Sequence, residues 1–246
     1  STLTAMLAKF LISEGMRVLV RDADESNRSL YKMLGLQAPN STLMEDLGGR
    51  VAVKKAVFDK QNSSASEDTK LHVDDLPRSC VSRRDDLAFL AIGKIYKPDE
   101  GCACPMSGLE KGFLERLYVP GWWVLVDCEA GVEHIGRGVW RHADVFLVVL
   151  EPSHESMEMA KFMNNLAKEV KRPIVTVVNM VDEDMAEDVK MSAEALGIGV
   201  DAVFSRDRRV ASANLIGQQV PLLPEFVPSL RACTEAILNK VREGTS

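Results

Sequence analysis

Residues 122–131 read Trp-Trp-Val-Leu-Val-Asp-Cys-Glu-Ala-Gly, an apolar run that ends at an acidic residue. A short continuous run of this kind predicts a strand that is buried on both faces, as the strands of a parallel sheet are. Asp127 and Gly131 then form an Asp-x-x-x-Gly arrangement directly after the strand. Such residues lie at the carboxyl edge of a parallel sheet, which is the edge where α/β folds bind ligands.

The same alternation extends to both sides of this stretch. Apolar runs that predict further strands lie at 18–20, 87–92, 145–150, 174–178 and 203–204. Helical spacing of apolar residues predicts helices near 3–14, 26–35, 107–117, 153–170, 210–216 and 230–241. A further helix is predicted after Asn179, ending at Leu196. In the helix that begins near 153, the predicted apolar stripe is Met159, Phe162, Met163, Leu166 and Val170. We therefore predict an α/β fold with a mostly parallel sheet and helices on both faces.

Length and composition fit one domain over residues 1–246. Residues 36–87 show little periodicity, so we expect a surface insertion there, with a solvated turn at Arg83-Arg84-Asp85-Asp86.

The formal net charge of −6 argues against nucleic acid as the main partner, and no apolar stretch reaches the ~18 residues of a membrane span. Five scattered cysteines favour the reducing cytoplasm over a disulfide framework.

Polar groups follow several of the predicted strands. They are Asp22 and Asp24, Gly93, the segment from Asp127 to Gly131, and Asn179. A carboxylate in such a place can hold a hydrated Mg²⁺ or orient a water for phosphoryl transfer. Taken one at a time, each aspartate fits a helix N-cap or a turn equally well.

Ser1 and Thr2 stand at the start of the first predicted helix. A phosphate-binding loop ends in Gly-Lys-Ser/Thr and runs directly into a helix, with the hydroxyl on Mg²⁺. The next strand ends in Asp-Ala-Asp, which is the arrangement expected after such a loop. A simple hydroxyl cap on the helix is the alternative interpretation of Ser1.

A set of short motifs, spread over nearly the whole chain, carries a family resemblance. The motifs are 1–3 (Ser-Thr-Leu), 22–27 (Asp-Ala-Asp-Glu-Ser-Asn), 47–50 (Leu-Gly-Gly-Arg), 93–95 (Gly-Lys-Ile), 101–105 (Gly-Cys-Ala-Cys-Pro), 127–134 (Asp-Cys-Glu-Ala-Gly-Val-Glu-His), 151–153 (Glu-Pro-Ser) and Asn179. Together they resemble the MinD/ParA/nitrogenase-iron-protein group of P-loop ATPases, most closely the CooC-type accessory ATPases of carbon monoxide dehydrogenase maturation. The runs at 102–105 and 129–134 are the specific ones.

The resemblance implies a role for each matching residue near the phosphates of ATP. Ser1 matches the Mg²⁺-binding hydroxyl, and Thr2 matches the neighbouring phosphate contact. Asp24 matches the catalytic carboxylate that positions the attacking water, with Asp22 close to the metal. Asp127 matches the second catalytic carboxylate, on the metal side.

The remaining nucleotide contacts are also implied by the resemblance. Asn27 belongs to the nucleotide-binding set, Gly131 matches the γ-phosphate sensor, and Asn179 matches the residue whose amide reads the adenine edge. In that family ATP lies between two subunits, so the resemblance implies a homodimer that ATP closes.

Cys102 and Cys104 form the second candidate site. Two thiolates leave a tetrahedral ion half coordinated, whereas two copies of Cys-x-Cys in a symmetric dimer provide four sulfur ligands. The resemblance likewise implies Ni²⁺ or Zn²⁺ between subunits. A pair of buried or unpaired thiols is the alternative.

Three functions follow as hypotheses. The first is an ATP-dependent maturation factor that delivers nickel to carbon monoxide dehydrogenase or another nickel enzyme, with neither nucleic acid nor membrane as a partner. The second is a partition or positioning ATPase of the ParA/MinD kind. The third is a non-catalytic metal-binding dimer module.

The family's loop, Gly-Lys-Gly-Gly-x-Gly-Lys, would lie before Ser1 together with the strand that precedes it. We therefore expect residues 1–246 to be an N-terminally truncated form without detectable ATP hydrolysis. Since that strand is central in such sheets, its loss would leave two neighbouring strands with unpaired edges.

Overall fold

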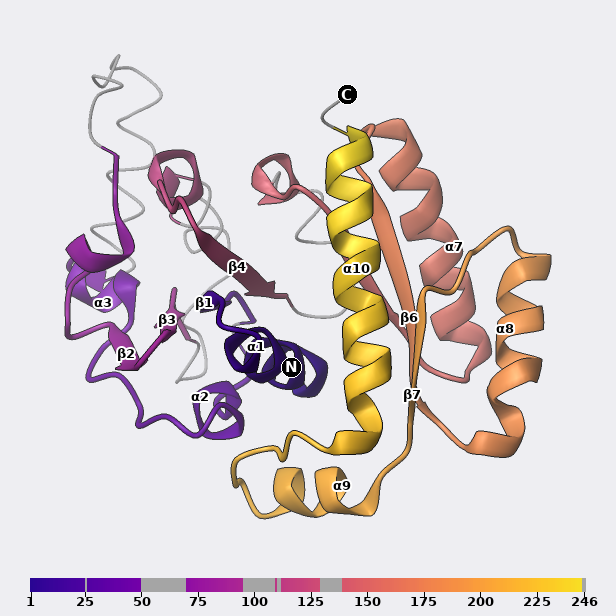
Figure 1. Cartoon of the computed structure of the whole chain (residues 1–246). Coiled ribbons are helices and arrows are strands. Elements are labelled where there is room, and N and C mark those ends of the chain that lie inside the picture. The colour runs from indigo at the N-terminus through magenta and orange to yellow at the C-terminus, as the bar shows by residue number, and fades with distance from the viewer. Residues whose placement is uncertain (25, 50–69, 95–108, 110–111, 129–138, 245–246) are drawn as a thin grey trace. The chain divides into compact units, whose positions relative to one another are not determined.

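The computed structural model of the chain describes residues 1–24, 26–49, 70–94, 109, 112–128 and 139–244. The chain divides into two compact units (Figure 1). Unit 1 consists of Ser1–His142 and Ala213–Val220, and unit 2 consists of Ala143–Ser212 and Pro221–Ser246. The described strands form a four-stranded sheet of order β2-β3-β1-β4 and a three-stranded sheet of order β5-β6-β7.

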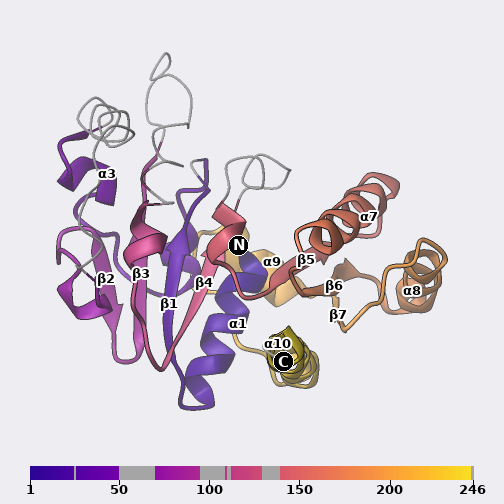
Figure 2. The ribbon, with the colours of Figure 1, turned by 90° about the horizontal axis from the view of Figure 1, so that it is seen from above.

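Unit 1 contains the four-stranded sheet. In chain order its described elements are α1 (Thr2–Ser13), β1 (Arg17–Asp22), α2 (Leu30–Met33), α3 (Leu43–Asp46), η2 (Val73–Asp75), β2 (Val81–Arg84), β3 (Leu87–Ala91), β4 (Trp122–Asp127) and η3 (Val139–His142). β1 runs parallel to both β3 and β4, and β2 pairs antiparallel with β3 (Figure 2). β1 and β3 are therefore the inner strands of this sheet.

The composition of these elements explains their positions. β1 is buried along its length after Arg17, and all of β3 is buried, because their apolar side chains pack on both faces of the sheet. On one face Leu19 and Leu90 share a hydrophobic cluster with Phe113. α1 packs against β1 and β4, and it buries an apolar stripe that includes Leu3, Met6, Leu7, Phe10 and Leu11.

Unit 2 contains the three-stranded sheet, whose strands are all parallel. Its described elements are β5 (Phe146–Leu150), α7 (His154–Glu169), β6 (Ile174–Val181), η4 (Glu183–Met185), α8 (Ala186–Ala195), β7 (Ala202–Ser205), η5 (Pro224–Phe226) and α10 (Val227–Gly244), while α9 (Arg208–Leu215) begins in unit 2 and ends in unit 1. α7 and α8 cover one face and α10 the other (Figure 2). Unit 2 is thus a three-layer α/β arrangement.

The fold class predicted from the sequence, α/β with mostly parallel strands and covering helices, is confirmed. Within the described residues β4 pairs only with β1, and β5 pairs only with β6. These two strands therefore each have an edge without a described partner. None of the helices in the described ranges combines the length and apolar character that crossing a bilayer requires.

Several local expectations are corrected. Part of the segment 36–87 is buried, since Leu43, Leu76 and Val81 belong to the unit 1 core. Arg83 and Arg84 lie in β2, and only Asp85-Asp86 forms the turn, with Asp85 at a φ of 50°. The four-residue strand is too short to show alternation, so its pairing with β3 could not be read from the sequence.

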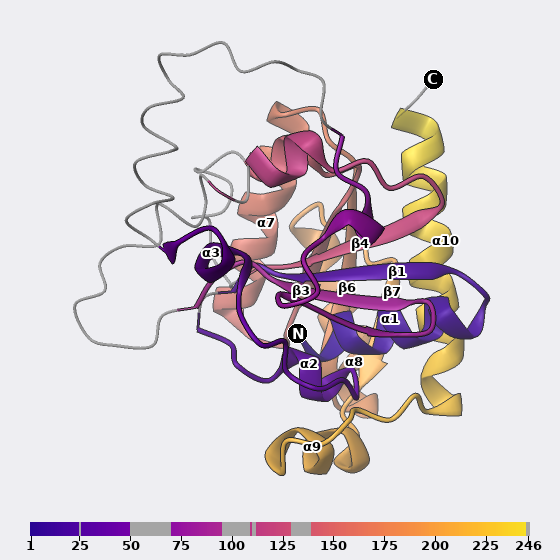
Figure 3. The same ribbon diagram turned by 90° about the vertical axis from the view of Figure 1, so that its left-hand side faces the viewer.

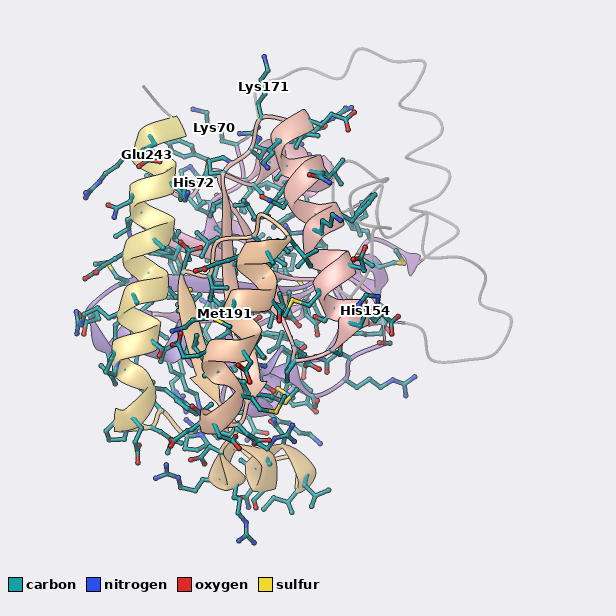
Figure 4. All side chains as sticks on the ribbon, turned by 90° about the vertical axis from the view of Figure 1, so that its right-hand side faces the viewer. Lys70, His72, His154, Lys171, Met191 and Glu243 are labelled. Carbon is teal, nitrogen blue, oxygen red and sulfur yellow. The ribbon has the colours of Figure 1, made fainter. Side chains whose placement is uncertain are left out.

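Two histidines lie at the starts of helices. His72 lies at the N-cap of η2 and His154 is the first residue of α7, and both side chains are exposed (Figure 4). The expected apolar stripe of α7 is wrong in part, because Phe162 is 49% exposed and the buried residues are Met157, Ala160 and Ala167.

Candidate functional site

The carboxyl ends of β1 and β4 bring two predicted site residues together. Asp22 and Asp127 are register partners, and the Ala23 amide donates to the Asp127 carbonyl oxygen over 2.9 Å. Because the strands are parallel, both side chains leave the sheet at the same edge. The start of α1 lies at this end of the sheet (Figure 3).

Ser1 joins this edge through its hydroxyl. Ser1 Oγ donates to Asp127 Oδ2 over 2.6 Å, and Thr4 Oγ1 donates to Asp127 Oδ1 over 2.6 Å. Ser1 makes no side-chain capping hydrogen bond to α1. The hydroxyl is therefore oriented by a carboxylate 126 positions away, and not by its own helix.

Asp24 and Asn27 form the next part of the cluster. Asp24 Oδ1 accepts from the Ser26 amide over 2.8 Å, from Ser26 Oγ over 2.7 Å and from the Asn27 amide over 3.1 Å. Asn27 Nδ2 in turn donates to Ser1 Oγ over 2.7 Å. Although burial alone would raise the pKa of Asp24, these hydrogen bonds and the charge of Lys94 outweigh it, so the pKa lies below its ordinary value.

Asp22 is paired with a buried lysine. Lys94 Nζ lies 2.6 Å from Asp22 Oδ2, and the two side chains are 6% and 2% exposed. Lys94 Nζ also donates to the backbone carbonyl of Asp24. Burial raises the pKa of Asp22 to about 6; Lys94 acts in the opposite direction, and the charges of Asp127 and Asp24 add to the rise.

The other predicted site residues lie elsewhere. Thr2 Oγ1 accepts from Asn214 Nδ2 over 2.9 Å, within unit 1. Asn179 is half-buried near the carboxyl end of β6 in unit 2, next to a bulge where Met180 has a φ of 56°. Gly131, Cys102 and Cys104 lie outside the described residues.

Two members of the cluster, Thr4 and Lys94, were not among the predicted site residues, and neither was Asn214, the partner of Thr2. Lys94 had a sequence signal, since Gly93-Lys94 directly follows a predicted strand. Thr4 lies one turn after Ser1 on α1, so it faces the same side as Ser1. Asn214 carries no comparable signal, because it lies 212 positions from Thr2.

The cluster offers the ligands that a hard cation prefers. Hydroxyl, carboxylate and amide oxygens suit Mg²⁺, which keeps several waters and takes few protein ligands. The described part of the chain holds no group of three or more His, Cys, Asp or Glu side chains arranged for a metal ion. The Ser1 hydroxyl lies between Asp127 and Asn27 and makes a hydrogen bond with each.

No protein-family model matches the chain. Several curated proteins are similar in sequence, including the following two. The ATP-binding protein MJ0084 of Methanocaldococcus jannaschii is 34% identical over 223 residues, which cover 89% of this chain and 88% of that protein. The carbon monoxide dehydrogenase accessory protein CooC of Rhodospirillum rubrum is 31% identical over 178 residues, which cover 69% of this chain and 65% of CooC.

Solved structures share the fold at lower identity. The cell division ATPase MinD of Pyrococcus furiosus matches with a TM-score of 0.62 and 17% identity, over 97% of this chain and 92% of that chain. The MinD protein of Pyrococcus horikoshii complexed with Mg-ADP matches with a TM-score of 0.59 and 17% identity, over 98% and 88%. A ParA family ATPase from Chlorobium tepidum TLS matches with a TM-score of 0.57 and 18% identity, over 98% and 91%. The chain thus has the fold of the MinD and ParA ATPases, and it belongs to the family of the ATP-binding protein MJ0084.

Proposed function

We propose that the protein is a P-loop ATPase that binds Mg²⁺ and ATP at the edge formed by Ser1, Asp22, Asp24, Asn27 and Asp127. The observation that carries the proposal is the Ser1 hydroxyl, which Asp127 and Asn27 hold and which does not cap its own helix. Two comparisons support it: MJ0084 is named as an ATP-binding protein, and a MinD structure of the same fold holds Mg-ADP.

Each residue has a distinct task in this proposal. Mg²⁺ neutralises charge on the phosphate oxygens when it is bound. Asp127 accepts the Ser1 proton and Asn27 Nδ2 donates to Ser1 Oγ, so one lone pair of that oxygen is left that would bind Mg²⁺. Asp24 keeps all three of its hydrogen bonds from Ser26 and Asn27 on Oδ1. Among the described contacts Oδ2 accepts none, so it is the oxygen that would orient an attacking water.

The Mg²⁺ dependence of nucleotide binding tests this proposal. In the protein as its gene encodes it, Mg²⁺ should strengthen binding of a non-hydrolysable ATP analogue at least about tenfold, since the cation bridges the phosphates and Ser1. Ser1→Ala should remove most of that gain, as measured by calorimetric titration with Mg²⁺ and with EDTA.

A serine at the other end of α1 provides the matched control. Ser13 Oγ donates to the Phe10 carbonyl oxygen over 2.7 Å, at the end of α1 opposite to Ser1. Ser13→Ala should bind the analogue like the unmodified protein under both conditions. Equal affinities with Mg²⁺ and with EDTA, or a Ser1→Ala variant that keeps the full gain, would refute the magnesium site.

We further propose that the protein acts as a homodimeric maturation factor that delivers nickel to an enzyme such as carbon monoxide dehydrogenase. The support is the partial similarity to CooC, whose name links it to that enzyme, and the pair Cys102 and Cys104. Two copies of the pair would give one Ni²⁺ or Zn²⁺ ion four sulfur ligands.

Metal stoichiometry tests this finer proposal. About one Ni²⁺ or Zn²⁺ per dimer is expected by elemental analysis, and Cys102→Ser and Cys104→Ser should each lose it, because two sulfurs would remain. The buried Cys233 gives the control, as Cys233→Ser should keep the metal. Metal-free protein that still hydrolyses ATP would favour a partition or positioning ATPase. Metal binding that ATP leaves unchanged would favour a non-catalytic metal-binding module.

A further inference from the structure

We propose that Lys94 is a positioning residue of the nucleotide site, which holds the backbone at Asp24 so that Asp24 and Asn27 face Ser1. The inference rests on the proposed ATPase function and adds a residue that lies outside the phosphate-loop motif. It is carried by the geometry around the Lys94 ammonium group.

Lys94 reaches two consecutive parts of the site. After β3 the chain continues beside the end of β1, where the Ile92 amide donates to the Asp22 carbonyl oxygen over 3.3 Å. From there Lys94 Nζ contacts Asp22 Oδ2 at 2.6 Å and donates to the Asp24 carbonyl oxygen. One buried cation thus fixes the side chain of Asp22 and the main chain of Asp24.

The contact with Asp24 is the one that bears on the reaction. Beyond Asp24, its carboxylate accepts from the Asn27 amide, and Asn27 Nδ2 donates to Ser1 Oγ. Ser1 Oγ then donates to Asp127. Hydrogen bonds therefore link Lys94, Asp24 and Asn27 in succession to the hydroxyl proposed to bind Mg²⁺, with the backbone of Asp24 and of Asn27 joining one bond to the next.

A second role for Lys94 would be to neutralise Asp22 alone. A buried carboxylate without a partner is unfavourable, so loss of the lysine could act only through stability. The two roles differ in one respect. Neutralisation is needed only while Asp22 is charged, whereas the contact with the Asp24 carbonyl oxygen is needed whichever residue stands at position 22.

A double-mutant cycle separates these roles. Lys94→Met keeps the apolar stem and removes the charge, and Asp22→Asn removes the opposite charge, so the double variant buries no unpaired ion. We expect Lys94→Met to lower kcat for ATP hydrolysis at least tenfold in the otherwise unmodified protein, with nucleotide affinity changed less than threefold; an unchanged kcat would contradict the proposal. Because Asp22 itself belongs to the proposed nucleotide site, the Asp22→Asn background is compared by hydrogen exchange and not by kcat.

A measurement without nucleotide keeps the test independent of the ATPase proposal. The Ser26 and Asn27 amides donate to Asp24, so hydrogen exchange reports whether that segment is held. Both amides should exchange at least tenfold faster in the Asp22→Asn, Lys94→Met double variant than in Asp22→Asn alone. Unchanged exchange refutes the positioning role. Faster exchange in a protein that neither binds nor hydrolyses ATP would refute the proposed function and leave the positioning of Asp24 in place.

Discussion

In the protein as its gene encodes it, Asp127→Asn should lower the turnover number for ATP about 100-fold, which corresponds to ~2.7 kcal/mol of transition-state stabilisation. The carboxylate is 5% exposed and accepts hydrogen bonds from both Ser1 Oγ and Thr4 Oγ1 at 2.6 Å. An asparagine side chain has a single acceptor oxygen and an NH₂ group that only donates, so it cannot accept one hydroxyl proton on each terminal atom as the carboxylate does. It also lacks the negative charge that strengthens these hydrogen bonds. Steady-state phosphate release at saturating Mg²⁺ and ATP measures the effect.

Asp46 provides a control of the same chemistry in the same unit. Its carboxylate also accepts hydrogen bonds from two hydroxyl groups, those of Ser41 and Ser79, and these hold α3 and not the strand ends. Asp46→Asn should therefore keep turnover within about twofold, whatever it does to stability. If Asp127→Asn and Asp46→Asn behave alike, Asp127 is a structural residue and the assignment of this edge is wrong.

Phe89→Ala should destabilise unit 1 by about 3–5 kcal/mol, because it removes a large buried side chain and leaves a cavity. Phe89 lies on the inner strand β3, is 1% exposed, and its ring centroid lies 6.3 Å from that of Tyr31. With a slope of about 2 kcal/mol per molar urea, the unfolding midpoint should fall by about 2 M.

Tryptophan fluorescence isolates this unfolding transition. Trp122 and Trp123 lie in β4 of unit 1, and all three tryptophans of the sequence fall in the residue range of that unit, so the emission reports on unit 1. Met16→Ala is the control, since Met16 is 44% exposed in the same unit and its loss should change stability by less than about 0.5 kcal/mol. A midpoint shift for Phe89→Ala as small as that for Met16→Ala would contradict the core described for β3.

The sequence could predict the elements because their signals are local. The apolar runs before Asp22 and Asp127 and the helical spacing after Ser1 each lie within a few residues, and the structure has β1, β4 and α1 at these places. The parallel pairing of the strands then brings Asp22 beside Asp127 without further information.

Contacts that depend on distant parts of the chain could not be predicted in this way. Lys94 and Asp22 are 72 positions apart, and neither residue reveals by its type that the other is its partner. Short elements failed for another reason. Helical spacing predicted a helix from about Ser26, but α2 extends only over Leu30–Met33. The amides of Ser26 and Asn27 donate to the Asp24 carboxylate, so these two residues form a turn and not the first turn of the helix.

The central claim is that Ser1 and Asp127 form the magnesium edge of a nucleotide site. The most direct test is a structure of the protein, as its gene encodes it, with Mg²⁺ and ADP bound. The account predicts Mg²⁺ at about 2.1 Å from Ser1 Oγ, with Asp127 still within hydrogen-bond distance of that hydroxyl or of a magnesium-bound water. A nucleotide bound away from the carboxyl ends of β1 and β4, or a Mg²⁺ ion that Ser1 does not contact, would contradict it.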